Sequence, residues 1–173
     1  MNKHLQLVGE FREKFDFPAG ADHLSDMAMV LRQSWLMEGG KQVLLAIVQG
    51  DMAVILTRLT GLAYLALNAI AAQGGEVDVQ PVIWRHDGSV LSLMRLITDR
   101  INACSSGRPK DYSALYCACA QLAGSFLNAD FDKSFRAFHQ HQLETGTAKG
   151  QGAENRGEVD WSKLPDLSDC LYE

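Results

Sequence analysis

Histidine side chains are the first candidates for chemistry in this sequence, because imidazole serves as a general base and as a metal ligand near neutral pH. His139 and His141 are separated by one residue, which turns them to different sides of a helix, whereas two ligands on one face need a spacing of three or four. We therefore expect a solvated surface pair. His23 and His86 occur singly near element boundaries, where capping or solvent contact is the expected role.

The four cysteines, the other candidate nucleophiles and soft ligands, show no Cys-x-x-Cys spacing and no histidine beside them. Cys104 and Cys119 fall in predicted helices and are expected to act as small core residues. The first residues, MNKHLQLVGEFREKF, are interrupted by charge, unlike a signal peptide. Reduced thiols and a cytoplasmic location are the expectation. The four positions are Cys104, Cys117, Cys119 and Cys170.

Composition and charge are those of an ordinary globular protein of 173 residues, with 47% hydrophobic and 21% charged residues. The net charge of −5 provides no global attraction for nucleic acid. The densest basic stretch is interrupted by Asp99 and Asp111, so we predict a solvated face and no nucleic-acid partner. Its basic residues are Arg95, Arg100, Arg108 and Lys110.

One apolar run, 53–72, approaches the roughly 20 residues needed to cross a bilayer. It contains Arg58 and polar residues such as Asn68, and a helix buried in a bundle is also apolar on all sides. We expect a buried core helix and no membrane partner.

Hydrophobic periodicity predicts an all-α fold with helical hairpins in tandem at 22–73 and 89–127. An amphipathic helix at 3–15 precedes them, 76–86 forms an extended crossover, and a shorter helix follows Asn128. The hairpins would form a four-helix-bundle-like core within a helical domain over 1–144. Residues 145–173 are predicted to be a linker and an extended C-terminal arm, which docks on the bundle or on a second subunit through residues such as Trp161.

The junction of the first hairpin carries helix-stop and helix-start signals. Gly50 can adopt the positive φ that ends a helix, and the Asp51 side chain can accept hydrogen bonds from the first free N–H groups of the next one. Gly39-Gly40 inside the first helix indicates a bend or a close backbone approach. Small residues including Ala53, Gly61 and Ala66 would let another helix pack closely on the second helix.

The same hairpin, 31–75, also carries a spaced pattern of Leu-Arg, Ala, Gly-Asp, two leucines and a tyrosine. This pattern resembles the core of the MazG-like all-α nucleoside triphosphate pyrophosphohydrolases, with weaker similarity at 8–15 and 131–140. The matching residues are Leu31, Arg32, Ala46, Gly50, Asp51, Leu59, Leu62 and Tyr64.

The resemblance implies a fold in which four carboxylates from two adjacent helices hold Mg²⁺ over the phosphates of a nucleotide, where the ion neutralises charge and activates water. At the four positions implied by the family pattern, which we call the vestigial metal-site positions, this chain has Glu38, Gln42, Arg58 and Gly61. Only Glu38 is acidic. From Met52 to Gly75 there is no Asp or Glu, so a site shared between the two helices cannot form within the hairpin.

Arg58 lies in the apolar helix and requires a partner or a route to solvent. One hypothesis is that its guanidinium pairs with Glu38 and occupies the volume of the lost metal. The alternative is that Arg58 extends along the helix to reach solvent.

Two functions are therefore open. The first is a non-catalytic descendant of the pyrophosphohydrolase fold, acting as a homo-oligomeric binding or regulatory module for a protein or nucleotide partner. The second is an active Mg²⁺-dependent pyrophosphohydrolase that draws carboxylates from elsewhere to join Glu38. The candidates for those carboxylates are Asp22, Asp26, Asp87 and Asp99.

Overall fold

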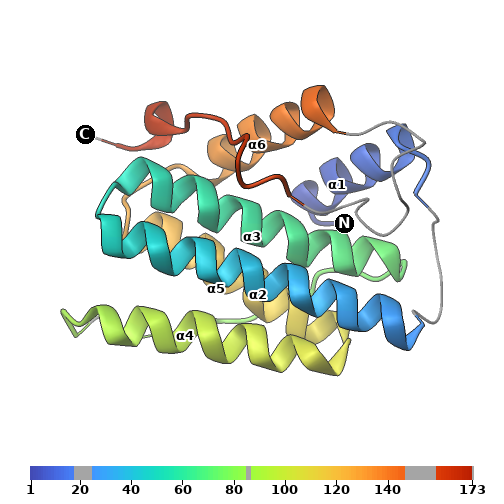
Figure 1. Cartoon of the computed structure of the whole chain (residues 1–173), viewed down its shortest axis with the longest axis horizontal. Helices are drawn as coiled ribbons and strands as arrows, with labels where there is room; N and C mark the ends of the chain where they lie inside the picture. Colours follow the sequence, from blue (N-terminus) through green and yellow to red (C-terminus); the bar gives the residue numbers. More distant parts are fainter. Residues whose placement is uncertain (18–24, 85–86, 147–158, 173) are drawn as a thin grey trace.

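The structure, a computed structural model, describes residues 1–17, 25–84, 87–146 and 159–172 (Figure 1). Those residues form six α-helices and no β-strand, so the predicted all-α fold is confirmed. The helices are α1 (Lys3–Lys14), α2 (Asp26–Gln49), α3 (Met52–Ala72), α4 (Val90–Ala103), α5 (Pro109–Ser125) and α6 (Phe131–Thr145), with 3₁₀ turns η1 (Cys104–Ser106) and η3 (Ser168–Cys170).

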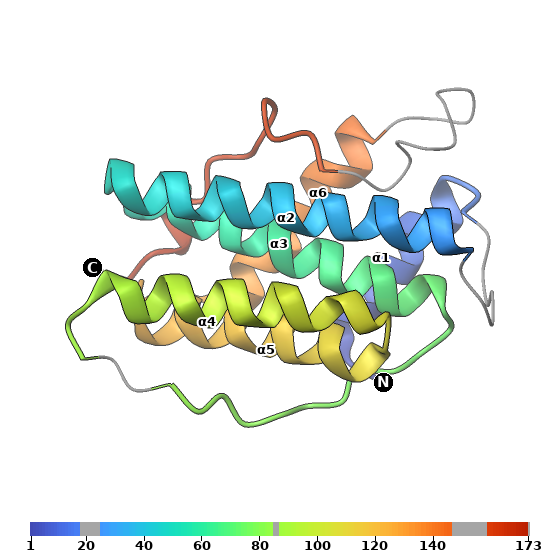
Figure 2. The ribbon, with the colours of Figure 1, turned by 60° about the horizontal axis from the view of Figure 1, so that its bottom comes forward.

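Helices α2 to α5 form the four-helix core. Helix α2 packs on α3, α3 on α5, α5 on α4, and α4 returns to α2, which closes the ring. Figure 2 shows α2 and α4 beside one another on one face of the bundle. The second hairpin therefore completes the bundle within one chain.

Helix α3 is the centre of the fold. It contacts α1, α2, α5 and α6, so its surface is covered on nearly every side. Its length and composition would also suit a membrane span, but 83% of its most apolar window is buried inside the protein. Contact with four neighbouring helices explains why this helix is apolar all round.

The predicted hairpin junction is confirmed. Gly50 has φ 77° and its N–H donates to Ala46 O, which ends α2. The Asp51 carboxylate accepts from Ala53 N and Val54 N at 3.0 and 3.2 Å, which starts α3. These are the left-handed glycine and the capping acid that the sequence indicated.

Helix α2 continues through Gly39 and Gly40, and side chains rather than another backbone lie against them. A Cβ on Gly39 would be 3.0 Å from Leu62 Cδ1, and one on Gly40 would be 2.5 Å from Ile101 Cδ1. The two glycines therefore admit a leucine of α3 and an isoleucine of α4.

The C-terminal segment 159–172 docks on its own chain. Val159, Leu167 and Cys170 are buried, and the segment passes between α3 and α6 in Figure 1. Asp130 N donates to Cys170 O at 2.8 Å, and Tyr172 N donates to Asn128 O at 2.9 Å. Most of the predicted linker, 147–158, lies outside the described residues, as do Asp22, His23 and His86.

Candidate functional site

Three of the four vestigial metal-site positions are joined by hydrogen bonds. Gln42 Nε2 donates to Glu38 Oε1 at 2.9 Å, one turn along α2. Arg58 Nη1 donates to the backbone carbonyl of Gln42 at 3.0 Å, which ties α3 to α2. Gln42 thus links the acid and the guanidinium through two different groups.

The predicted ion pair between Arg58 and Glu38 is absent from the described part of the chain. The carboxylate is bonded to the Gln42 amide, and the guanidinium takes a main-chain oxygen instead. Arg58 is half-buried, and its Nε atom is buried without a hydrogen-bond partner. The pairing hypothesis is therefore wrong, although Arg58 does occupy the space between the two helices.

The fourth position, Gly61, is covered by an aromatic ring from the C-terminal segment. A Cβ on Gly61 would lie 2.9 Å from Cη2 and Cζ3 of Trp161 and 3.2 Å from Phe138 Cζ. A Cβ on Gly39 would lie 3.2 Å from Cζ2 of the same indole. One edge of Trp161 therefore lies against a glycine of α2 and a glycine of α3, an arrangement we call the tryptophan plug.

Two further contacts hold the segment that carries the tryptophan plug. Thr57 Oγ1 lies 3.4 Å from Pro165 O, and His141 Nε2 lies 2.7 Å from Lys163 O. The small-residue face at Gly61, expected to receive another helix, is thus occupied by this chain's own C-terminal segment.

The other carboxylates do not complete a metal site. Among the described residues no three His, Cys, Asp or Glu side chains are grouped closely enough to hold a metal ion. Asp26 lies at the start of α2, roughly 18 Å along the helix from Glu38. Asp87 accepts a hydrogen bond from Ser89 N ahead of α4, and Asp99 is exposed on α4. Asp26, Asp87 and Asp99 therefore do not converge with Glu38.

The prediction for His139 is wrong, because this residue is buried, with 5% of its surface exposed. Its Nδ1 lies 3.0 Å from Tyr64 Oη, and its Nε2 lies 3.7 Å from Glu10 Oε2. Burial, opposed by the charge of Glu10, lowers the pKa of His139. The spacing correctly predicted that His139 and His141 lie on different sides of a helix. The spacing did not indicate which side of α6 faces the core.

His4 is a buried polar residue that the sequence analysis missed. Its Nδ1 lies 2.7 Å from Tyr116 Oη of α5, and its Nε2 lies 2.8 Å from Asp132 Oδ1 of α6. The imidazole also stacks on Phe135, with 4.3 Å between ring centroids. Burial lowers the pKa of His4 despite the carboxylate, so a neutral ring donates to Asp132 and accepts from Tyr116.

Both buried histidines make stability depend on pH in the same direction. The folded pKa values of His4 and His139 lie below the value of about 6.5 expected in the unfolded chain. Between these values the unfolded chain binds more protons, so the free energy of unfolding should fall as the pH drops below about 6.5. Urea unfolding at a series of pH values from 7.5 to 5 measures this change. In the double variant His4→Phe/His139→Phe the free energy of unfolding should depend less steeply on pH. If the free energy of unfolding of the unmodified chain stayed constant or increased as the pH was lowered from 7.5 to 5, the prediction would be contradicted.

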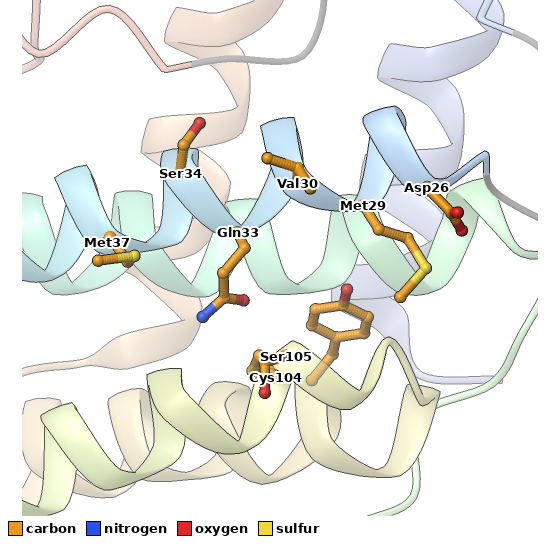
Figure 3. Close-up of a pocket in the computed structure, with 9 residues that line it drawn as sticks. Asp26, Met29, Val30, Gln33, Ser34, Met37, Cys104 and Ser105 are labelled. Atoms are coloured by element: carbon orange, nitrogen blue, oxygen red, sulfur yellow. The ribbon is translucent and has the colours of Figure 1, made fainter.

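A separate pocket of about 490 Å³ lies between α2 and the start of α5 (Figure 3). Met29 and Gln33 extend from α2 toward η1, where Cys104 and Ser105 lie, and Tyr112 forms part of the wall. Gln33 Nε2 donates to Ile101 O at 2.9 Å, whereas its buried Oε1 has no partner. Burial and the charge of Asp111 raise the pKa of the Cys104 thiol to about 12, so this cysteine is not an activated nucleophile.

Searches with this chain found no matching family model, no matching curated protein and no matching solved structure.

Proposed function

We propose that this protein is a non-catalytic descendant of the MazG-like all-α pyrophosphohydrolase fold and acts as an oligomeric helical binding or regulatory module. The tryptophan plug carries the proposal. A metal between α2 and α3 would need carboxylates projecting from both helices, whereas the two positions on α3 are Arg58 and a glycine, Gly61, that is covered by an indole. Its partner is a second protein or a nucleotide bound without hydrolysis.

The charges at the vestigial metal-site positions support the same conclusion. Arg58 brings a cation to the inner side of the hairpin, and its bond to the Gln42 carbonyl holds it there. Glu38 is the only acid of the four and is already bonded to Gln42. A positive charge and a single carboxylate disfavour a divalent cation, which needs several oxygen ligands.

Turnover tests this proposal. The purified chain, incubated with each common nucleoside triphosphate and Mg²⁺ or Mn²⁺, should release no pyrophosphate above the rate of a protein-free control. Trp161→Ala should remain equally inactive, because uncovering the glycines adds no carboxylate. The melting temperature should also be unchanged by added Mg²⁺, since a bound ion would raise it.

A family enzyme that retains all four carboxylates serves as the positive control. Metal-dependent turnover that disappears in Glu38→Ala would overturn the proposal and favour an active Mg²⁺-dependent pyrophosphohydrolase.

A further inference from the structure

The solvent-facing side of α2 is unusually apolar. Between positions 27 and 48 every exposed residue of this helix falls on one stripe with spacings of three and four, and five of the seven are Met, Val or Leu. Val48 is 84% exposed and Met27 is 75% exposed, at the two ends of the stripe. The α2 stripe consists of Met27, Val30, Ser34, Met37, Lys41, Leu45 and Val48.

The α2 stripe reads the same from both ends of the helix. Its midpoint lies between Met37 and Glu38, which is also the midpoint of α2. When the helix is turned end for end about this midpoint, the outer positions of the stripe exchange one apolar residue for another. The positions closer to the midpoint exchange one polar residue for another. The exchanged positions are Met27 with Val48, Val30 with Leu45, and Ser34 with Lys41.

We infer that α2 is the interface of a symmetric dimer, in which it packs antiparallel against α2 of a second copy of this chain. A two-fold axis brings residue i onto residue j and residue j onto residue i, which is the pairing that the reflected stripe provides. Met27 then meets Val48 of the partner subunit, and Val30 meets Leu45 of the partner subunit. The two Met37 side chains lie beside the axis.

Charge near the axis favours the same arrangement. Lys41 is exposed, and the ion pairs of the described residues do not include it. In the antiparallel pair, Lys41 lies about one turn from Glu38 of the partner subunit, and the symmetry repeats this approach. A parallel pair in register would instead place Lys41 against Lys41 and Glu38 against Glu38, which is repulsive.

The available area is that of a small interface. The α2 stripe is about 32 Å long at 1.5 Å per residue. The start of α4 lies near the end of α2 (Figure 2), and Val90, Leu91 and Met94 in the first turns of α4 are exposed. A stripe about 10 Å wide, together with about 6 Å of α4, covers roughly 400 Å² on each copy and roughly 800 Å² on both, which is the size of a weak interface.

The pocket beside α2 lies at the same interface. Val30, Ser34 and Met37 belong both to its wall and to the α2 stripe (Figure 3). In the antiparallel pair Val30 and Ser34 face Leu45 and Lys41 of the partner subunit, respectively, and Met37 lies beside the axis. Side chains of the second copy would therefore cover the opening that a single chain leaves exposed.

Cysteine cross-linking of the full chain tests the arrangement. Met27→Cys and Val48→Cys chains, co-expressed and mildly oxidised, should form a disulfide-linked heterodimer, whereas each variant alone should stay uncross-linked. The unmodified protein and Gln121→Cys, exposed on α5, control for the native cysteines and for random collision. Self-cross-linking of each single variant would indicate a parallel pair and overturn the inference.

The mass in solution provides the second measurement. Light scattering should give twice the chain mass of 19.0 kDa for the unmodified protein and a single chain for Val30→Glu/Val48→Glu. A single-chain mass for the unmodified protein, or a dimer that survives this double substitution, would overturn the inference. The inference rests on the oligomeric part of the proposed function, but pyrophosphate release does not enter its test. Failure of the dimer and failure of the non-catalytic assignment are therefore distinguishable.

Discussion

Gly61→Leu should destabilise the fold by about 3 kcal/mol, because it inserts a branched side chain into a filled space. A Cβ alone would stand 2.9 Å from two atoms of Trp161 and 3.2 Å from Phe138 Cζ. The helix propensity gained on replacing glycine offsets roughly 1 kcal/mol of the strain. Urea unfolding monitored by circular dichroism measures the change.

Gly124→Leu is the matched control, because Gly124 is also helical but no atom of a neighbouring element lies within 4 Å of its Cβ position. This substitution should leave stability unchanged or raise it by up to about 1 kcal/mol. In a Trp161→Ala background the cost of Gly61→Leu should fall by at least about 1 kcal/mol, because the two side chains compete for one volume. Equal costs in both backgrounds would show that Trp161 does not occupy that volume.

His4→Ala should cost about 3 kcal/mol of unfolding free energy. The change removes hydrogen bonds to Tyr116 and Asp132 and the ring stacked on Phe135. It also leaves a cavity and a buried tyrosine hydroxyl with one partner fewer. Thermal and urea unfolding at pH 7.5, where the ring is neutral, measure the loss.

His141→Ala provides the control, since this histidine makes a single hydrogen bond, to Lys163 O, at a less buried position of α6. It should cost less than about 1 kcal/mol. His4→Phe keeps the aromatic packing and loses the hydrogen bonds. The unfolding free energy that it costs should therefore lie between the costs of His141→Ala and His4→Ala. If His4→Ala were no more destabilising than His141→Ala, the imidazole would not join α1 to α5 and α6.

Sequence reasoning succeeded where the signal is local. Gly50 and Asp51 specify the hairpin junction through backbone conformation and a capping side chain, and each acts within a few residues. The buried positions of α3 follow from its continuous apolar composition. Cys104 and Cys119 are buried as expected.

Sequence reasoning failed where the position of a side chain depends on segments that lie far apart in the chain. Spacing turned His139 and His141 to different sides of a helix, but only packing on α1 and α3 determines that His139 faces inward. The tryptophan plug joins Gly61 to a residue 100 positions later, and nothing near either residue indicates it. The absence of acidic residues from 52–75 was visible in the sequence, whereas the ring of Trp161 against Gly61 was not.

The position of Trp161 also has a consequence for synthesis. A ribosome that has just completed Gly61 must add about 100 more residues before the indole exists, which takes roughly 5 to 20 s at ordinary elongation rates. During that interval the α2–α3 hairpin can form, but the groove over Gly39 and Gly61 has no cover. The nascent chain therefore leaves Gly39 and Gly61 uncovered until Trp161 has been synthesised and can pack against them.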